Sequence, residues 1–178
     1  MKMPSPVGHV YAIGLGSNRR HGRYGSPGQV LDGAIAALDR AGIHPLLVSP
    51  VIATRPVGPG GRAYANAAAL VATAMEPRAL LLVLKAIERA FGRRRGQRWG
   101  ARVLDLDILL WSGGAWTSGG ECHLRIPHRQ LSRRRFVLDP LVVIAPGWRL
   151  PDGRTVRQHH VRLTRAKPIH RTRDRSGP

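Results

Sequence analysis

Two of the ten acidic residues in this chain, Asp105 and Asp107, lie one residue apart in the apolar run from Val103 to Leu110. Alternate side chains of a β-strand point to the same face, so these carboxylates would project together, with Cα atoms roughly 7 Å apart. Their repulsion would cost on the order of 2 kcal/mol at an effective dielectric constant near 20. A divalent cation would offset that cost, and Mg²⁺ is usually held by one or two carboxylates together with substrate phosphates. The alternative, which this pair taken alone favours less, is that the two charges guard an exposed sheet edge.

The segment that leads into the aspartates is rich in arginine and glycine. Its arginines are Arg93, Arg94, Arg95, Arg98 and Arg102. Each guanidinium offers a planar fork of donors that suits phosphate oxygens, although such a segment alone is as often a solvated basic loop. The glycine motifs of P-loop and dinucleotide-binding proteins are absent from the sequence, as are the protein-kinase motifs. Phosphate chemistry here would therefore depend on arginine and metal clamps.

A second group of residues could bind a flat heteroaromatic ring. Tyr64 and Asn66 supply an aromatic ring and an amide, and the Pro- and Gly-rich segment from Thr54 to Pro59 supplies backbone groups. A tyrosine in a strand more often serves packing, so this indication is weak by itself. His128, in a basic stretch after Pro127, could contact a phosphate, although a lone histidine in such a loop is more often structural or exposed.

Length and composition predict one domain. The chain has 178 residues, of which 43% are hydrophobic, and we expect the domain to span residues 1–165 and the basic tail, 166–178, to be disordered. A formal charge of +19 favours polyanionic partners such as nucleotides, nucleic acid or acidic lipid. The single Cys122 excludes an internal disulfide and a cysteine-based zinc site. The sequence contains no membrane-span-like run and no signal-peptide pattern, which predicts a cytoplasmic protein without a membrane partner.

The hydrophobic pattern predicts the order β-α-β-β-α-β. Strands are expected over residues 9–15, 46–53 and 64–73 and in the run with the two aspartates, and helices over residues 29–41 and from Pro77 to Phe91. This order is the ferredoxin-like α+β motif, in which two helices cover one face of an antiparallel sheet. Pro50 should interrupt or edge the second strand. We also expect a short extra strand over residues 124–126 and a short helix over residues 138–145.

Several motifs, in this order, resemble those of the 6-hydroxymethyl-7,8-dihydropterin pyrophosphokinase family. They are G-L-G-S-N at 14–18, the segment 54–59, Y-A-N-A at 64–67, R-W-G-A-R-V-L-D-L-D-I at 98–108, I-P-H at 126–128 and F-V-L-D-P-L at 136–141. The resemblance covers roughly residues 10–150. It implies a ferredoxin-like fold and the transfer of the terminal diphosphate of ATP to the pterin hydroxymethyl oxygen, which releases AMP in folate biosynthesis.

The resemblance also implies roles for individual residues. Asp105 and Asp107 would hold two Mg²⁺ ions that bridge the ATP phosphates, and Arg93 and Arg102 would act in catalysis as the loop containing Trp99 closes. The residues implied to bind the pterin are Thr54, Val57, Tyr64, Asn66 and Phe136. Those implied to bind ATP are Glu88, Arg95, Trp99, Arg102, Ile108, His128 and Arg134. ATP and the pterin are the expected partners, and we expect a monomer.

The chain departs from the family pattern at Arg55, Ala101 and Arg129, in a shorter loop at 92–99 and in an insertion near 19–28. None of these changes touches the aspartate pair or the residues implied to bind the pterin. The competing hypothesis is a basic ferredoxin-like nucleic-acid-binding module. Aromatic residues make up only 5% of the chain, and the RNA-stacking motif is absent, so no specific nucleic-acid partner is expected.

Overall fold

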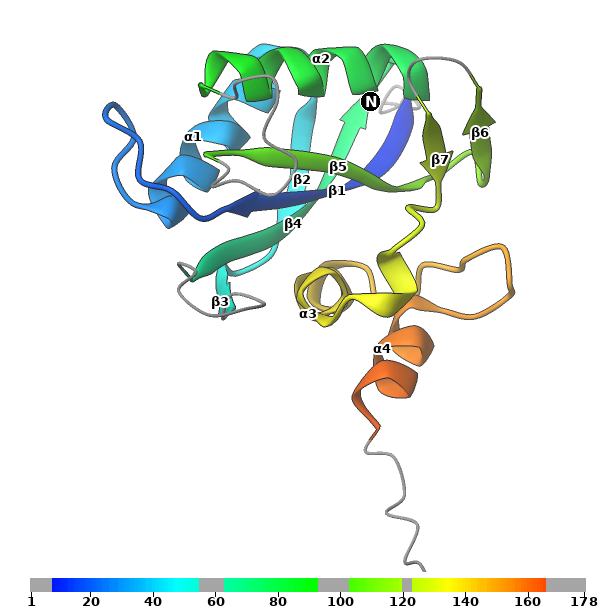
Figure 1. Cartoon of the computed structure of the whole chain (residues 1–178). Helices are drawn as coiled ribbons and strands as arrows, with labels where there is room; N and C mark the ends of the chain where they lie inside the picture. Colours follow the sequence, from blue (N-terminus) through cyan, green and yellow to red (C-terminus); the bar gives the residue numbers. More distant parts are fainter. Residues whose placement is uncertain (1–7, 55–62, 93–102, 120–122, 166–178) are drawn as a thin grey trace, which may run out of the picture.

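A computed structural model of the chain describes residues 8–54, 63–92, 103–119 and 123–165 (Figure 1). The strands are β1 (His9–Ser17), β2 (His44–Val48), β3 (Ile52–Thr54), β4 (Tyr64–Thr73), β5 (Asp105–Trp111), β6 (Trp116–Ser118) and β7 (Leu124–Ile126). The α-helices are α1 (Pro27–Arg40), α2 (Pro77–Ala90), α3 (Arg135–Ile144) and α4 (Val156–Thr164), and a 3₁₀ turn spans Leu131–Arg133. None of the helices in these ranges has the length and apolarity needed to cross a membrane.

The main sheet is antiparallel and has the strand order β2-β4-β1-β5, with β3 also paired to β4. Helices α1 and α2 cover one face, and α3 lies against the other with α4 beyond it (Figure 1). β6 and β7 form a separate hairpin. The described chain is therefore an α+β structure in which helices flank an antiparallel sheet, as the sequence predicts at this level.

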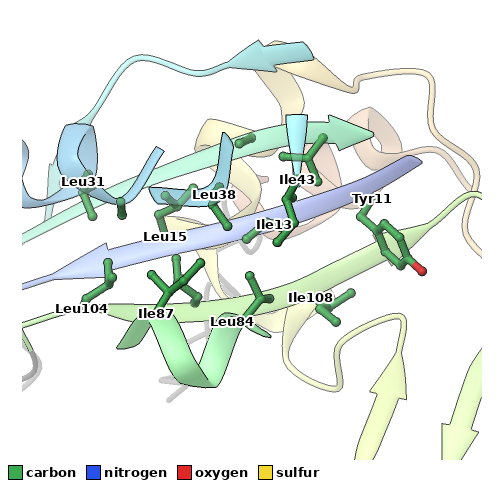
Figure 2. Packing of buried hydrophobic residues seen from close by; sticks show 14 of the residues in the cluster. Tyr11, Ile13, Leu15, Leu31, Leu38, Ile43, Leu84, Ile87, Leu104 and Ile108 are labelled. Carbon is green, nitrogen blue, oxygen red and sulfur yellow. The ribbon is translucent and has the colours of Figure 1, made fainter. Parts of the chain in front are cut away.

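The larger core lies between the sheet and the pair α1 and α2. Alternate residues of β1 point into it, and Leu84 and Ile87 of α2 meet them there (Figure 2). Leu84 is fully buried, and Ile87 is 8% exposed. Helix α1 starts in a capping box, because the Ser26 hydroxyl accepts from the Gln29 N–H and the Gln29 side chain accepts from the Ser26 N–H. In both helices the spacing of the apolar residues determines which side faces the sheet.

A second core fixes α3 and α4 under the opposite face of the sheet. Its buried residues include Ala12, Leu109, Leu138, Leu141 and Val156. The predicted helix at 138–145 starts at Arg135 instead and continues through Pro140, so its predicted limits were wrong. Helix α4 was not predicted, because only Val156 on it is buried.

The predicted strand at 46–53 is divided in two. β2 ends at Val48, and β3 resumes at Ile52 on the same neighbour, β4. Between them Ser49 stays tied to β4, because its N–H donates to the Ala68 carbonyl oxygen and its hydroxyl accepts from the Ala68 N–H. Pro50 follows and cannot donate to a ladder, which explains the break at this point.

Asp152 ties the segment before α4 to the helix itself. Burial by itself raises the pKa of this carboxyl, but hydrogen bonds from Arg154 and His159 outweigh burial and lower the pKa to about 2. A lowered pKa in the folded state stabilises the fold above about pH 4, and this contribution is lost as the pH falls towards 2.

We therefore expect Asp152→Asn to lower the free energy of unfolding at pH 7 by only about 0.5 kcal/mol, because the side chain is 40% exposed. Urea unfolding at several pH values would measure the difference between the two proteins. The difference should shrink below pH 4. A difference that is the same at pH 7 and pH 3 would contradict this assignment.

Candidate functional site

A cleft opens on the sheet face that carries α3, between the middle of the sheet and the start of that helix. Its lining residues come from β1, β4, β5 and the segment from His128 into α3. They are Gly14, Leu15, Gly16, Asn66, Ala67, Asp105, Asp107, Leu109, His128, Arg134, Phe136 and Val137. Carboxylates, an amide, a histidine, an arginine and an aromatic ring therefore share one cleft.

Two glycines of β1 form the floor of this cleft. Gly14 is paired with Asp107 and Gly16 with Asp105 in the antiparallel register. A Cβ atom added at Gly14 would lie 3.3 Å from the Leu109 side chain, and one added at Gly16 would lie 3.5 Å from Asn66 Oδ1. A larger side chain at Gly16 would therefore fill the space between the amide of β4 and the carboxylates of β5.

Both aspartates line the cleft, as the strand alternation predicts. They are half-buried, whereas Leu106 and Ile108 are buried in the core on the α1 and α2 side. Figure 2 shows the Ile108 side chain in that core. Any contact between Ile108 and a nucleotide would thus have to come from its main chain.

The outer edge of β5 is covered by two side chains of α2. β5 stands at one end of the strand order, and the Leu106 N–H donates to Glu88 Oε1 at 2.8 Å. Lys85 Nζ donates to the same Glu88 oxygen at 2.8 Å and to the Leu106 carbonyl oxygen at 3.4 Å. The edge at this point is already covered, which weakens the alternative that the aspartates guard it. Glu88 itself is fully buried and is not among the cleft residues.

Asn66 is held in place from β3. Its Nδ2 donates to the Thr54 hydroxyl oxygen at 2.8 Å, and the residue is only 6% exposed. Thr54 pairs with Tyr64 in the β3 and β4 register, so these three predicted pterin residues lie in one corner of the sheet. Of the three, Asn66 lines the cleft, and Thr54 supports it from behind.

The segment from His128 into α3 brings the predicted residues His128, Arg134 and Phe136 to the cleft. The His128 N–H donates to the Leu109 carbonyl oxygen, and His128 Nδ1 accepts from the Gln130 N–H at 3.2 Å. With Nδ1 as acceptor, the neutral ring carries its proton on Nε2. The Arg134 guanidinium lies 5.6 Å from the centre of the Phe136 ring, within the range of a cation–π contact.

Five predicted site residues, Val57, Arg93, Arg95, Trp99 and Arg102, lie outside the described residues, as does the tail at 166–178. The sequence reasoning did not identify Leu109, Val137 or Lys85. Alternation from Asp105 and Asp107 could have placed Leu109 on the cleft face, and Val137 adjoins Phe136. Lys85 lies one helical turn before Glu88, but only the tertiary structure brings it to β5.

The donor set limits which metal the cleft could hold. Among the described residues, no three His, Cys, Asp or Glu side chains gather where they could hold a metal ion. Two carboxylates without further protein ligands do not suit zinc, which takes three or four. They do suit Mg²⁺, which keeps water and substrate phosphates as its other ligands.

Residues 12–146 match the family model for 7,8-dihydro-6-hydroxymethylpterin-pyrophosphokinase (HPPK). The chain is 39% identical over 150 residues to the 2-amino-4-hydroxy-6-hydroxymethyldihydropteridine pyrophosphokinase of Pseudomonas aeruginosa, covering 83% of this chain and 87% of that protein. The protein of the same name from Synechocystis sp. is 39% identical over 155 residues, which cover 84% and 74% of the two chains.

A solved structure of Plasmodium falciparum HPPK-DHPS is similar, with a TM-score of 0.60 and 12% identity. The match covers 87% of this chain and 42% of that longer chain, and at this identity it shows the fold alone. The span matched by the family model includes every residue that lines the cleft.

Proposed function

Because this chain belongs to the 7,8-dihydro-6-hydroxymethylpterin-pyrophosphokinase family and is a pyrophosphokinase of folate biosynthesis, we propose that its cleft binds ATP with Mg²⁺ beside 6-hydroxymethyl-7,8-dihydropterin. The observation that carries this proposal is the shared cleft. Asp105 and Asp107 open into the same space as Asn66 and Phe136, so a phosphate-bound metal and a flat ring could lie side by side.

Asp105 and Asp107 would hold the Mg²⁺, which we expect as two ions. When bound, the metal would neutralise phosphate charge and align the reacting groups. The support from the chain is that the main chain carrying the two carboxylates is held on both sides. The residues that carry them are paired to glycines of β1, and the main chain between them is bonded to α2. A carboxylate pair held in this way need not reorganise when the phosphates arrive.

Asn66 and Phe136 would recognise the pterin. One of the two Nδ2 hydrogens of Asn66 is bonded to Thr54, which fixes the amide, and its Oδ1 is the acceptor that can bond to an N–H group on the edge of the ring. Phe136 offers a ring face for stacking, and Tyr64, half-exposed in the same corner as Asn66, would cover the other side. Val57 belongs to the same proposed contact from outside the described residues.

The nucleotide would lie beside His128 and Arg134. His128 Nε2–H and the Arg134 guanidinium are donors for phosphate oxygens. Glu88 and Lys85 occupy the Leu106 N–H and carbonyl at the outer edge of β5. The alternation of a strand directs the N–H and carbonyl of Ile108 to the same edge, where an adenine could bond to them. Glu88 would act indirectly, through β5. Arg93, Arg95, Trp99 and Arg102 remain predictions for this half of the site.

The reaction needs no nucleophile from the protein. The pterin hydroxymethyl oxygen would form a bond to the β-phosphorus of ATP, while the bond from that phosphorus to the oxygen bridging to the α-phosphorus breaks. AMP leaves with the electron pair, and the hydroxyl proton passes to solvent. The role of the chain is to hold both substrates in line, to exclude competing water and to stabilise charge on the transferred group.

The strand order β2-β4-β1-β5 supports a ferredoxin-like topology, with β2 and β3 together standing for one strand of that motif. We expect the protein to act as a cytoplasmic monomer. The family membership sets aside a nucleic-acid-binding module as the principal function.

The proposal predicts the products and the metal requirement. The protein with Mg-ATP and the pterin should release AMP and pterin diphosphate in equal amounts, as measured by chromatography, and excess EDTA should abolish both. A reaction without the pterin is the control and should yield no AMP. ADP together with a pterin monophosphate would contradict the proposed reaction.

A further inference from the structure

Two side chains of α2 hold both main-chain groups of the residue between the aspartates. The Leu106 N–H donates to Glu88 Oε1 at 2.8 Å, and the Leu106 carbonyl oxygen accepts from Lys85 Nζ at 3.4 Å. That N–H belongs to the peptide unit that joins Leu106 to Asp105. The carbonyl belongs to the peptide unit that joins it to Asp107, so α2 contacts the main chain beside each aspartate.

The inner edge of the same segment is fixed by β1. Gly16 pairs with Asp105 and Gly14 with Asp107. On an end strand the outer N–H and carbonyl groups would ordinarily bond to water. Here α2 replaces that water, so the two peptide units are held from both sides, which sets the direction in which the Cα–Cβ bond of each aspartate leaves the strand.

Charge and burial make Lys85 important in this arrangement. Glu88 is fully buried, and burying a carboxylate is costly unless it is paired and hydrogen-bonded. The Lys85 ammonium lies 2.8 Å from Glu88 Oε1, and its side chain is 35% exposed. Lys85 therefore does two things at once, because it balances the buried charge and bonds to the strand that this charge supports.

We propose that Lys85 is a positioning residue for the metal site and acts through Glu88 and Leu106 on the orientation of Asp105 and Asp107. The inference rests on the proposed function, in which those carboxylates hold Mg²⁺. Groups that orient metal ligands without touching the metal typically change metal affinity or activity by about 10- to 100-fold when they are removed. Lys85 is such a group, because it bonds to the Leu106 carbonyl oxygen and to Glu88, which in turn accepts from the Leu106 N–H.

The test is Lys85→Met, which keeps much of the apolar stem and removes the charge and the donor. We expect the Mg²⁺ concentration at half-maximal rate to rise about tenfold and kcat to fall, with the KM for the pterin unchanged. Lys85→Arg should restore most of the Mg²⁺ dependence. Arg78→Met is the matched control, because it removes one positive charge from an exposed position on α2 and should behave as wild type.

A binding measurement separates positioning from general stability. Mn²⁺ affinity, measured by electron paramagnetic resonance with a non-hydrolysable ATP analogue, should weaken about tenfold in Lys85→Met. Amide exchange at Leu106 should become faster than in the Arg78→Met control. Wild-type Mn²⁺ affinity and Mg²⁺ dependence in Lys85→Met would overturn the inference, even if its melting temperature falls.

Two further variants keep the outcome decisive. If Lys85→Met does not fold, Lys85→Gln replaces it, and wild-type metal dependence in that variant overturns the inference. Asp107→Asn is measured in the same titrations. If Asp107→Asn leaves Mn²⁺ binding intact, the proposed metal site is wrong. If it weakens binding while the Lys85 variants do not, only the inference about Lys85 fails.

Discussion

Replacing Asp107 with alanine is expected to lower kcat on the order of 10³-fold and to leave the fold intact. The variant removes one of the two carboxylates that we assign to the metal, so charge on the transferred diphosphate would lose much of its stabilisation. The fold should survive because the residue lies half-buried at the cleft and its main chain stays paired with Gly14. The loss of one of two neighbouring negative charges should even raise the melting temperature slightly.

Steady-state kinetics at saturating ATP and pterin would measure this effect, and calorimetry would report the melting temperature. Asp32→Ala is the matched control, because it makes the same change of charge at an exposed position on α1. It should retain wild-type kcat. If Asp107→Ala kept more than a tenth of the wild-type kcat at ordinary Mg²⁺ concentrations, the metal assignment would be wrong.

The sequence predicted the fold best where the hydrophobic pattern of a segment was clear. β4 begins and ends at the predicted residues, 64 and 73, because a long apolar strand lies between clear turn segments. Alternation also placed Asp105 and Asp107 on the cleft face of β5. The same alternation would have turned the Ile108 side chain away from the cleft, but the family resemblance assigned that residue a nucleotide contact without distinguishing side chain from main chain.

Other parts of the fold depend on contacts that periodicity does not encode. α4 has a polar sequence, and the second core holds it mainly through Val156. The capping box of Thr155 and Gln158 marks the start of α4 in the sequence, but the segment lacks the apolar periodicity on which the helix predictions were based. Pro140 lies inside α3 and removes one helix hydrogen bond, and the packing of Leu138 and Leu141 in the second core offsets that loss.

In the candidate site, too, the sequence identified the functional side chains but not the tertiary contacts that hold them. Residue types and spacing identified the carboxylates, the amide and the aromatic ring. The groups that hold them were not visible, because Thr54 bonds to Asn66 from the neighbouring strand and Lys85 bonds to Leu106 from a helix 21 positions away in sequence. Groups that orient the reactive residues are therefore the part of this site that required a structure.

Asn66→Ala is expected to lower kcat/KM for the pterin about 10²-fold, mainly through KM. Asn66 is 6% exposed, and its Oδ1 is the group that we assign to a ring N–H donor. Without it, the bound ring would leave a donor unsatisfied in a site sheltered from water, which costs about 1–3 kcal/mol. The KM for ATP should change little, because Asn66 comes from β4 and is not among the proposed phosphate donors, which come from the segment leading into α3.

Thr54→Val is the matched control for this variant. It removes the same 2.8 Å hydrogen bond to Asn66 Nδ2 but leaves Oδ1 in the cleft. If Oδ1 recognises the ring, Thr54→Val should retain most of the pterin affinity that Asn66→Ala loses, as measured by steady-state kinetics and by calorimetric titration of the pterin. Equal losses in the two variants would show that the Thr54 bond, rather than a contact with the ring, is what makes Asn66 necessary. In that case the pterin edge would have to be recognised by other groups in the cleft.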